Sequence, residues 1–152
     1  MTKKFNTLIV FIACLPPRIL LSQAVSDSSW IHSHAIVDTC YTVHGRLQIA
    51  NGTPSFRVWI VGTRRYLSVH QVETDSGFVL AMPSRLCRLL DLHTFIYANF
   101  RVCPFTKYIP GEMQMVGIES ATRIVVERIV QDSTGGQTRE LRRIDEAVFI
   151  KR

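Results

Sequence analysis

The sequence predicts an all-β domain with one short helix, arranged as a small barrel similar to the OB-fold. Three observations predict it. Three strand-like segments separated by turns come first, a helix-like segment follows, and further strand-like segments complete the chain. Three meandering strands, a helix and two closing strands are the order of the OB-fold. A sandwich of two sheets capped by the helix is the alternative.

The first predicted strand covers residues 41–49, in which apolar and polar residues alternate. Val43, Leu47 and Ile49 share one face, because successive side chains of a strand point to opposite sides. Gly45 falls on that same face. A missing side chain there permits the tight curvature that the first strand of a barrel needs.

Turn sequences separate this strand from two more. Asn51-Gly52 and Thr53-Pro54 form the first turn, and the second begins at Gly62. The strands that follow these turns alternate in the same way. They are predicted at residues 56–61 and 66–72.

The period then changes to that of a helix. Pro83-Ser84 starts a segment up to residue 91 in which leucines recur at helical spacing. Runs rich in β-branched and aromatic residues follow and predict further strands. They cover residues 95–102, 113–119 and 123–130, and residues 138–150 are expected to fold back as a last strand or tail.

The first 24 residues have the order of a secretory signal peptide. Lys3 and Lys4 precede an apolar run at residues 8–15, and a small-x-small ending follows at Ala24. The protein is therefore expected to be exported, periplasmic or extracellular, with cleavage after Ala24. An alternative is lipid attachment at Cys14, and another is an ordinary amphipathic helix. The apolar run is too short to span a bilayer.

The remaining chain is one domain by length. Residues 25–39 are expected to be a leader segment, 40–131 the β-barrel domain, and 132–152 a C-terminal hairpin arm or tail. With 47% hydrophobic and 20% charged residues, the chain is unlike a disordered protein. The formal net charge is +6, and removing the signal peptide leaves a mildly basic chain, which by itself does not indicate nucleic acid.

Three cysteines follow the predicted signal peptide, and an odd number in an exported protein implies one disulfide and one free thiol. Cys40 and Cys103 lie in strand-like segments, whereas Cys87 lies in the helix-like one. The sequence therefore favours a Cys40–Cys103 disulfide. Three buried thiols are the alternative.

A basic and aromatic cluster surrounds the second and third predicted strands. Its members are the candidate ligand-binding residues Arg57, Trp59, Arg64, Arg65 and Tyr66. On an OB-like barrel these strands form the usual binding face. Guanidinium groups and aromatic rings there suit single-stranded nucleic acid or sugars. Alternatively, the arginines are solvated strand positions and Trp59 covers a hydrophobic edge.

The predicted function is therefore an exported, non-catalytic binding module whose partner is a protein or an anionic envelope polymer. Single-stranded nucleic-acid binding through the same face is the alternative. A further alternative is a small enzyme that uses His44 or Glu112 in a pocket, although no catalytic motif is present. His32-x-His34 alone offers too few ligands for a metal site, and no cofactor is expected.

Parts of the chain resemble a group of uncharacterised secreted bacterial proteins. The likeness covers roughly residues 40–121. It is carried by Val43-His44-Gly45-Arg46-Leu47, by residues 51–59 and 61–65, by Val102-Cys103-Pro104-Phe105, and by Pro110-Gly111-Glu112-Met113-Gln114. The resemblance implies a small exported domain of unknown activity and no catalytic residues.

Overall fold

The computed structural model describes residues 36–74 and 77–149, which form an all-β fold with one short helix, as the sequence predicts. The predicted signal peptide, Cys14 and most of the predicted leader lie outside the described residues. Within the described part, no helix has the length and apolarity that a membrane crossing requires.

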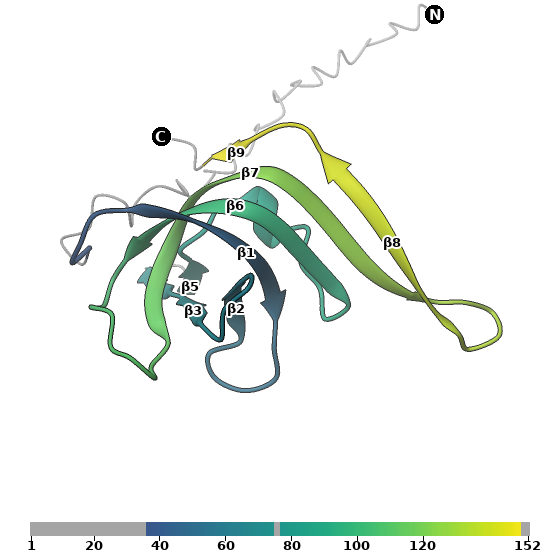
Figure 1. Ribbon diagram of the computed structural model, residues 1–152, viewed down its shortest axis with the longest axis horizontal. Coiled ribbons are helices and arrows are strands. Elements are labelled where there is room, and N and C mark those ends of the chain that lie inside the picture. Colours follow the sequence, from purple (N-terminus) through teal and green to yellow (C-terminus); the bar gives the residue numbers. More distant parts are fainter. Residues whose placement is uncertain (1–35, 75–76, 150–152) are drawn as a thin grey trace, which may run out of the picture.

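The elements follow one another along the chain and are labelled in Figure 1. They are β1 (Tyr41–Ile49), β2 (Phe56–Ile60), β3 (Tyr66–Val69), β4 (Gln71–Thr74), β5 (Gly77–Leu80), α1 (Ser84–Cys87), β6 (Thr94–Pro104), β7 (Gln114–Gln131), β8 (Gln137–Ile144) and β9 (Val148–Phe149).

The main sheet closes on itself to form a barrel. Its strands lie in the order β3-β2-β1-β6-β7, and β3 also pairs in parallel with β7, so that these strands make a ring. All other pairings in the ring are antiparallel. A meander of three strands, a helix and two further strands, closed by a parallel pair, is the OB arrangement. The barrel is therefore present, and the alternative two-sheet sandwich is not.

The barrel interior is filled by the residues that alternate inward along each strand. Leu47 of β1, Val58 of β2 and Phe100 of β6 are fully buried at its centre. Gly45 lies among them, and a Cβ atom on it would lie 2.5 Å from Cγ1 of Val58. The sequence predicts that the missing side chain permits tight curvature, and the structure shows a further reason for the glycine, because the Val58 side chain of the neighbouring strand lies where a side chain would stand.

β7 is one 18-residue strand, although the sequence predicts two separate runs there. Two register shifts against β6 explain the difference, because Glu119 and Arg123 are extra residues on β7 at these points. Arg123 takes a positive φ of 54°. Such bulges bend a strand and increase its twist without ending it.

The C-terminal part of β7 pairs with β8, from Ile124–Ile144 to Gln131–Gln137, and up to Arg128 it also pairs with β6 on its other side. The two strands form an arm that projects from one side of the barrel (Figure 1). β9 returns to pair with β7 at Ser120 and Ala121. The sequence predicts a hairpin arm, a last strand or a tail after residue 132, and β8 and β9 are the elements that the structure has there.

Two other elements differ from the sequence expectation. The predicted strand at residues 66–72 is divided at His70 into β3, which belongs to the barrel, and β4, which pairs with β5 in a separate hairpin. The predicted helix at residues 83–91 is shortened to α1. Leu86 of α1 is buried in the barrel core, and Leu89 and Leu90, which follow the helix, pack against that core.

Candidate functional site

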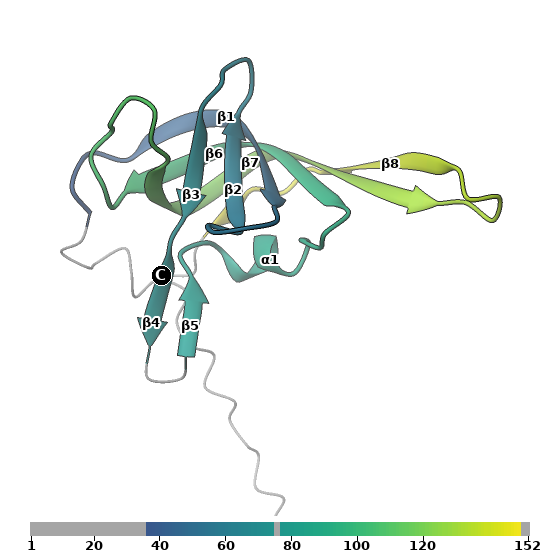
Figure 2. The same cartoon turned by 90° about the horizontal axis from the view of Figure 1, so that it is seen from below.

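Two connections meet at one end of the barrel. The turn between β2 and β3, residues 61–65, and the loop between β6 and β7, residues 105–113, lie at the end where β3 and β7 begin (Figure 2). The loop between β1 and β2, residues 50–55, lies at the opposite end of these strands. In the OB arrangement, ligands bind on the face of the second and third strands, between the loops at either end.

A surface depression of about 320 Å³ lies on this face. It is lined by Arg57, Arg64, Arg65, Tyr66, Tyr108, Gly111, Glu112 and Met113. Four of the five predicted ligand-binding residues therefore line one depression, together with the β6–β7 loop. Three guanidinium groups against one carboxylate make the depression basic.

Arg65 connects the β2–β3 turn to the β6–β7 loop. Its guanidinium carbon lies 4.1 Å from the centroid of the Tyr108 ring, within the range of a cation–π contact. Arg64 is exposed on the same turn, and Tyr66 is 36% exposed at the start of β3. The turn and the loop thus hold cationic and aromatic groups side by side.

Arg57 has a second role in the β1–β2 loop. Its Nε donates a hydrogen bond to the carbonyl oxygen of Pro54 at 2.7 Å, and its Nη2 lies 3.5 Å from that of Asn51. The guanidinium group thus organises this loop through its contacts with two backbone carbonyl oxygens. Arg57 therefore links the loop to the depression.

Trp59 lies apart from the depression. Its Nε1 donates a hydrogen bond to the carbonyl oxygen of Thr63 at 2.8 Å. The guanidinium of Arg46 lies over the Trp59 ring at 5.1 Å from its centroid, and over the Phe95 ring at 4.9 Å. The structure therefore places the Trp59 ring in a stack with Arg46 of β1, which in turn lies over Phe95 of β6.

A chain of hydrogen bonds near this end of the barrel begins at Tyr41, the first residue of β1. Its hydroxyl donates to Oε1 of Gln114 at 2.7 Å, and Nε2 of Gln114 donates to the carbonyl oxygen of Thr106 at 2.9 Å. Burial raises the pKa of Tyr41, and the positive charge of Arg65 opposes this shift. The chain of hydrogen bonds ties the base of the β6–β7 loop to β1 and β7.

The two residues proposed for an enzyme lie on different elements, and only one of them lines the depression. His44 faces outward on β1, with Nδ1 3.0 Å from Oδ1 of Asn99 on the neighbouring β6. Glu112 lines the basic depression in the β6–β7 loop. The structure therefore brings Glu112, but not His44, to the candidate site.

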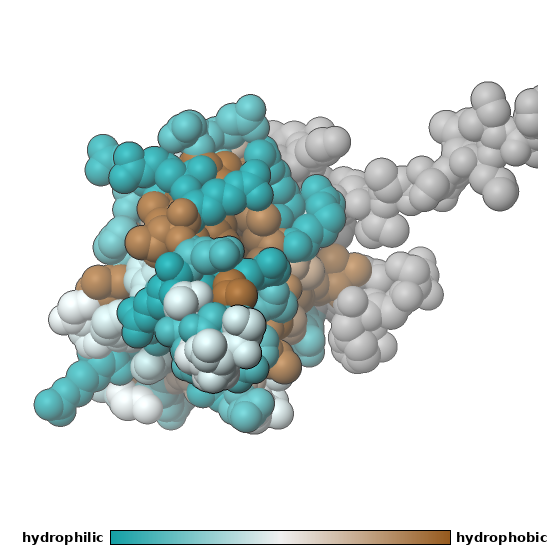
Figure 3. Space-filling model, turned by 90° about the vertical axis from the view of Figure 1, so that its right-hand side faces the viewer, coloured by the Kyte–Doolittle hydropathy of each residue, from teal (hydrophilic) through white to brown (hydrophobic). Residues whose placement is uncertain are grey.

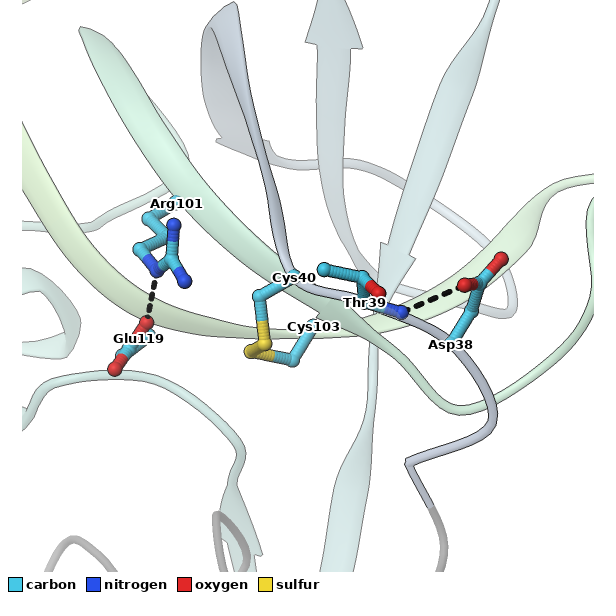
Figure 4. Close-up of a disulfide and its surroundings, with 6 residues drawn as sticks. All are labelled: Asp38, Thr39, Cys40, Arg101, Cys103 and Glu119. Carbon is cyan, nitrogen blue, oxygen red and sulfur yellow. Dashed lines mark hydrogen bonds and ion pairs between the residues drawn. A yellow bond between two sulfur atoms is a disulfide. The ribbon is translucent and has the colours of Figure 1, made fainter.

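The predicted disulfide is confirmed between Cys40 and Cys103, and Cys87 is a free, exposed cysteine. The disulfide joins the chain just before β1 to the end of β6, beside the ion pair of Arg101 with Glu119 (Figure 4). Such cross-links form and persist in oxidising compartments.

The same place contains the one convergent group of metal-ligand types in the described part of the chain. It consists of Cys40, Cys103 and Glu119. The two sulfur atoms are bonded to each other, so that they do not offer thiolates to a metal. His32 and His34 lie outside the described residues.

Sequence reasoning did not assign Tyr108 and Met113 to the site. Residues 106–112 are recognisable as a Pro/Gly loop, but the face on which that loop lies depends on the closure of β7 against β3. The sequence alone therefore gave no signal that Tyr108 belongs to the binding face.

Comparisons of the chain with models of protein families, with curated proteins and with solved structures find no match.

Proposed function

We propose that this protein is an exported, non-catalytic binding module that binds a linear anionic polymer in the basic depression of the barrel. The observation that carries the proposal is the convergence of Arg57, Arg64 and Arg65 with Tyr108 on the face that OB barrels use for extended ligands. Guanidinium groups bind phosphate and carboxylate groups through paired hydrogen bonds.

Export is supported by two separate features of the chain. The first 24 residues have the pattern of a signal peptide. The Cys40–Cys103 disulfide is buried on the Cys103 side and suits an oxidising compartment. The resemblance of residues 40–121 to secreted bacterial proteins agrees with an anionic polymer of the cell envelope as the ligand.

A polymer without bases is favoured over single-stranded nucleic acid. Binding of bases requires aromatic rings with a free face. Arg46 lies over one face of the Trp59 ring outside the depression, and Arg65 lies over one face of the Tyr108 ring within it. The depression is lined by three arginines and by two partly exposed tyrosines, Tyr66 and Tyr108. Cationic groups are therefore more available in the depression than stacking surfaces are.

Fluorescence anisotropy with two probes tests the proposal. The first probe is a fluorescein-labelled single-stranded oligo(dT), and the second is unlabelled inorganic polyphosphate added as a competitor. We expect polyphosphate to displace the oligonucleotide at comparable or lower concentrations of anionic groups. Both affinities should fall steeply with salt, because binding releases counterions.

The Arg64→Ala/Arg65→Ala variant locates the binding. We expect this variant to bind both oligo(dT) and polyphosphate more weakly. The slope of the logarithm of the oligo(dT) binding constant against the logarithm of the salt concentration should become shallower by about 1.4, since each contact with a single-stranded backbone contributes about 0.7. The matched control, Arg142→Ala/Arg143→Ala, removes two arginines from the arm instead and should leave both affinities unchanged.

Three outcomes would contradict the proposal. Absence of binding at low salt would exclude a polyanion ligand. Equal losses in the two variants would show that binding follows net charge and not the depression. Preference for oligo(dT) over polyphosphate by about tenfold or more would support a nucleic-acid-binding protein in its place.

A further inference from the structure

The outer edge of the arm presents unpaired backbone groups. β8 pairs with β7 on one side, and within residues 36–74 and 77–149 no strand pairs with its other side. All of its eight residues except Ile144 are exposed. An edge of this length offers a row of N–H and C=O groups to an additional strand.

The side chains along this edge are basic with an apolar centre. Leu141 is 71% exposed, and Arg139 and Arg143 lie two residues to either side of it on the same face of the strand. Glu140 and Arg142 occupy the opposite face. Figure 3 shows the side to which the arm projects, where hydrophobic residues are exposed between hydrophilic ones.

One of the three arginines is neutralised within the arm. Arg139 forms an ion pair with Glu127 of β7, Nη1 to Oε1 at 3.2 Å, and Glu127 is itself only 7% exposed. Arg142 and Arg143 form no ion pair with another described residue. They leave positive charge on each face of the edge strand.

A second copy of the chain cannot match all of this charge. If two β8 strands paired antiparallel about Leu141, Glu140 of each would lie opposite Arg142 of the other, but Arg139 would lie opposite Arg143. A shift by one residue places either Arg139 opposite Arg142, or Glu140 opposite Arg143 and Arg142 opposite Leu141. In each of these registers the single glutamate of β8 faces at most one of Arg142 and Arg143, whereas an acidic partner can place a carboxylate opposite both.

We propose that β8 is a docking edge for an extended acidic segment of another protein, which adds to the arm as a further strand. Backbone hydrogen bonds along residues 137–144 supply affinity, and carboxylates beside Arg142 and Arg143 with an apolar residue beside Leu141 supply specificity. This surface is separate from the basic depression, and the proposal does not depend on the anionic polymer.

A labelled peptide tests the proposal on the full chain. The probe is fluorescein-labelled Val-Glu-Glu-Val-Thr-Glu-Val-Thr, which in antiparallel pairing places glutamates opposite the three arginines and valine opposite Leu141. Two control peptides accompany it. One replaces each glutamate by lysine, and the other carries N-methyl groups on alternate backbone amides that would face β8.

We expect the acidic peptide to bind and both control peptides to bind at least about tenfold more weakly. Arg142→Glu/Arg143→Glu should weaken the acidic peptide by a similar factor, while Arg64→Glu/Arg65→Glu, an equal charge change at the depression, should not. Circular dichroism of each variant verifies the fold. In the wild-type protein, the bound peptide should slow hydrogen exchange of alternate amides within residues 137–144.

Each contrary result overturns the proposal. Absence of binding up to about 1 mM peptide, the weak end of specific recognition, excludes an acidic strand at this edge. Equal binding of the N-methylated peptide excludes strand addition. Equal weakening by the two charge-reversed variants places the peptide elsewhere or shows attraction to net charge. A dimer in sedimentation that Arg142→Glu/Arg143→Glu dissociates would assign the edge to a second copy.

Discussion

Removal of the Cys40–Cys103 disulfide should destabilise the barrel strongly. The cross-link joins residues 63 positions apart in the sequence. In the chain-entropy model, closing a loop of this length lowers the entropy of the unfolded chain and so raises the free energy of unfolding by about 4 kcal/mol at 25 °C. For a urea dependence of about 2 kcal/mol per molar, this loss lowers the midpoint of unfolding by about 2 M.

Urea unfolding followed by far-UV circular dichroism measures this effect. The oxidised wild-type protein is compared with the same protein in a reducing agent, in which both sulfur atoms remain in place. The Cys40→Ala/Cys103→Ala variant provides a second, covalent measurement. Cys87→Ala is the control, because Cys87 is exposed and outside the disulfide, so its midpoint should match that of the wild type.

The disulfide also affects the proposed binding site. It lies at the end of β6, immediately before the loop that carries Tyr108. We therefore expect the reduced protein to lose polyanion affinity at urea concentrations where the oxidised protein still binds. If reduction changes the free energy of unfolding by less than about 1 kcal/mol, the argument from loop length is refuted, because the cross-link would then restrict little of the unfolded chain.

Two further predictions concern the barrel. Gly45→Ala should destabilise it by about 1–3 kcal/mol, because the new Cβ would lie 2.5 Å from Cγ1 of Val58. In a urea double-mutant cycle, Val58→Ala should relieve part of this loss, and additive effects would contradict the predicted clash. Burial lowers the pKa of His70 below its ordinary value of 6.5. As the pH falls, His70 is protonated in the unfolded chain before it is protonated in the folded protein, which favours the unfolded chain. The free energy of unfolding should therefore fall as the pH drops below 6.5. His70→Gln should reduce that dependence in urea titrations from pH 7.5 to 5, and equal pH dependence in both proteins would disprove the role of His70.

The part of the fold that depends on neighbouring residues could be predicted from the sequence. Alternation in β1, the Asn51-Gly52 turn and the second strand are local patterns, and together they specify the meander. The position of Gly45 on the inward face of β1 also follows from the alternation, whereas the close approach of Val58 to it does not. The Cys40–Cys103 pair could be chosen because both cysteines lie in strand-like segments.

The parts that were missed depend on contacts between distant segments. Nothing local marks Glu119 and Arg123 as bulged residues, because neither is a glycine. The sequence therefore predicts two strands where β7 is one. Similarly, alternation places Arg46 and Trp59 on outward faces of their strands. Their stacking depends on the register of β1 against β2, which pairs them directly.

The candidate site shows the same division between local and distant information. Arg57, Arg64, Arg65 and Tyr66 are close in sequence, and their common location follows from one hairpin. Tyr108 reaches them only because β7 closes the barrel against β3 and brings the β6–β7 loop to the β2–β3 turn. The strand pattern of the sequence can therefore predict the part of the binding face that lies on one hairpin. The part that lies on the β6–β7 loop can be predicted only when the closure of the barrel is known.

Closure also determines how the two proposed surfaces are related. β7 begins at Gln114, next to the depression, and its last residues form the inner strand of the arm. The bulges at Glu119 and Arg123 absorb the bend between these parts, so that the strand remains continuous. A polymer in the depression and a strand on β8 would occupy opposite ends of one strand and share no side chain. Their binding is therefore expected to be simultaneous, and saturating polyphosphate should leave the affinity of the acidic peptide unchanged.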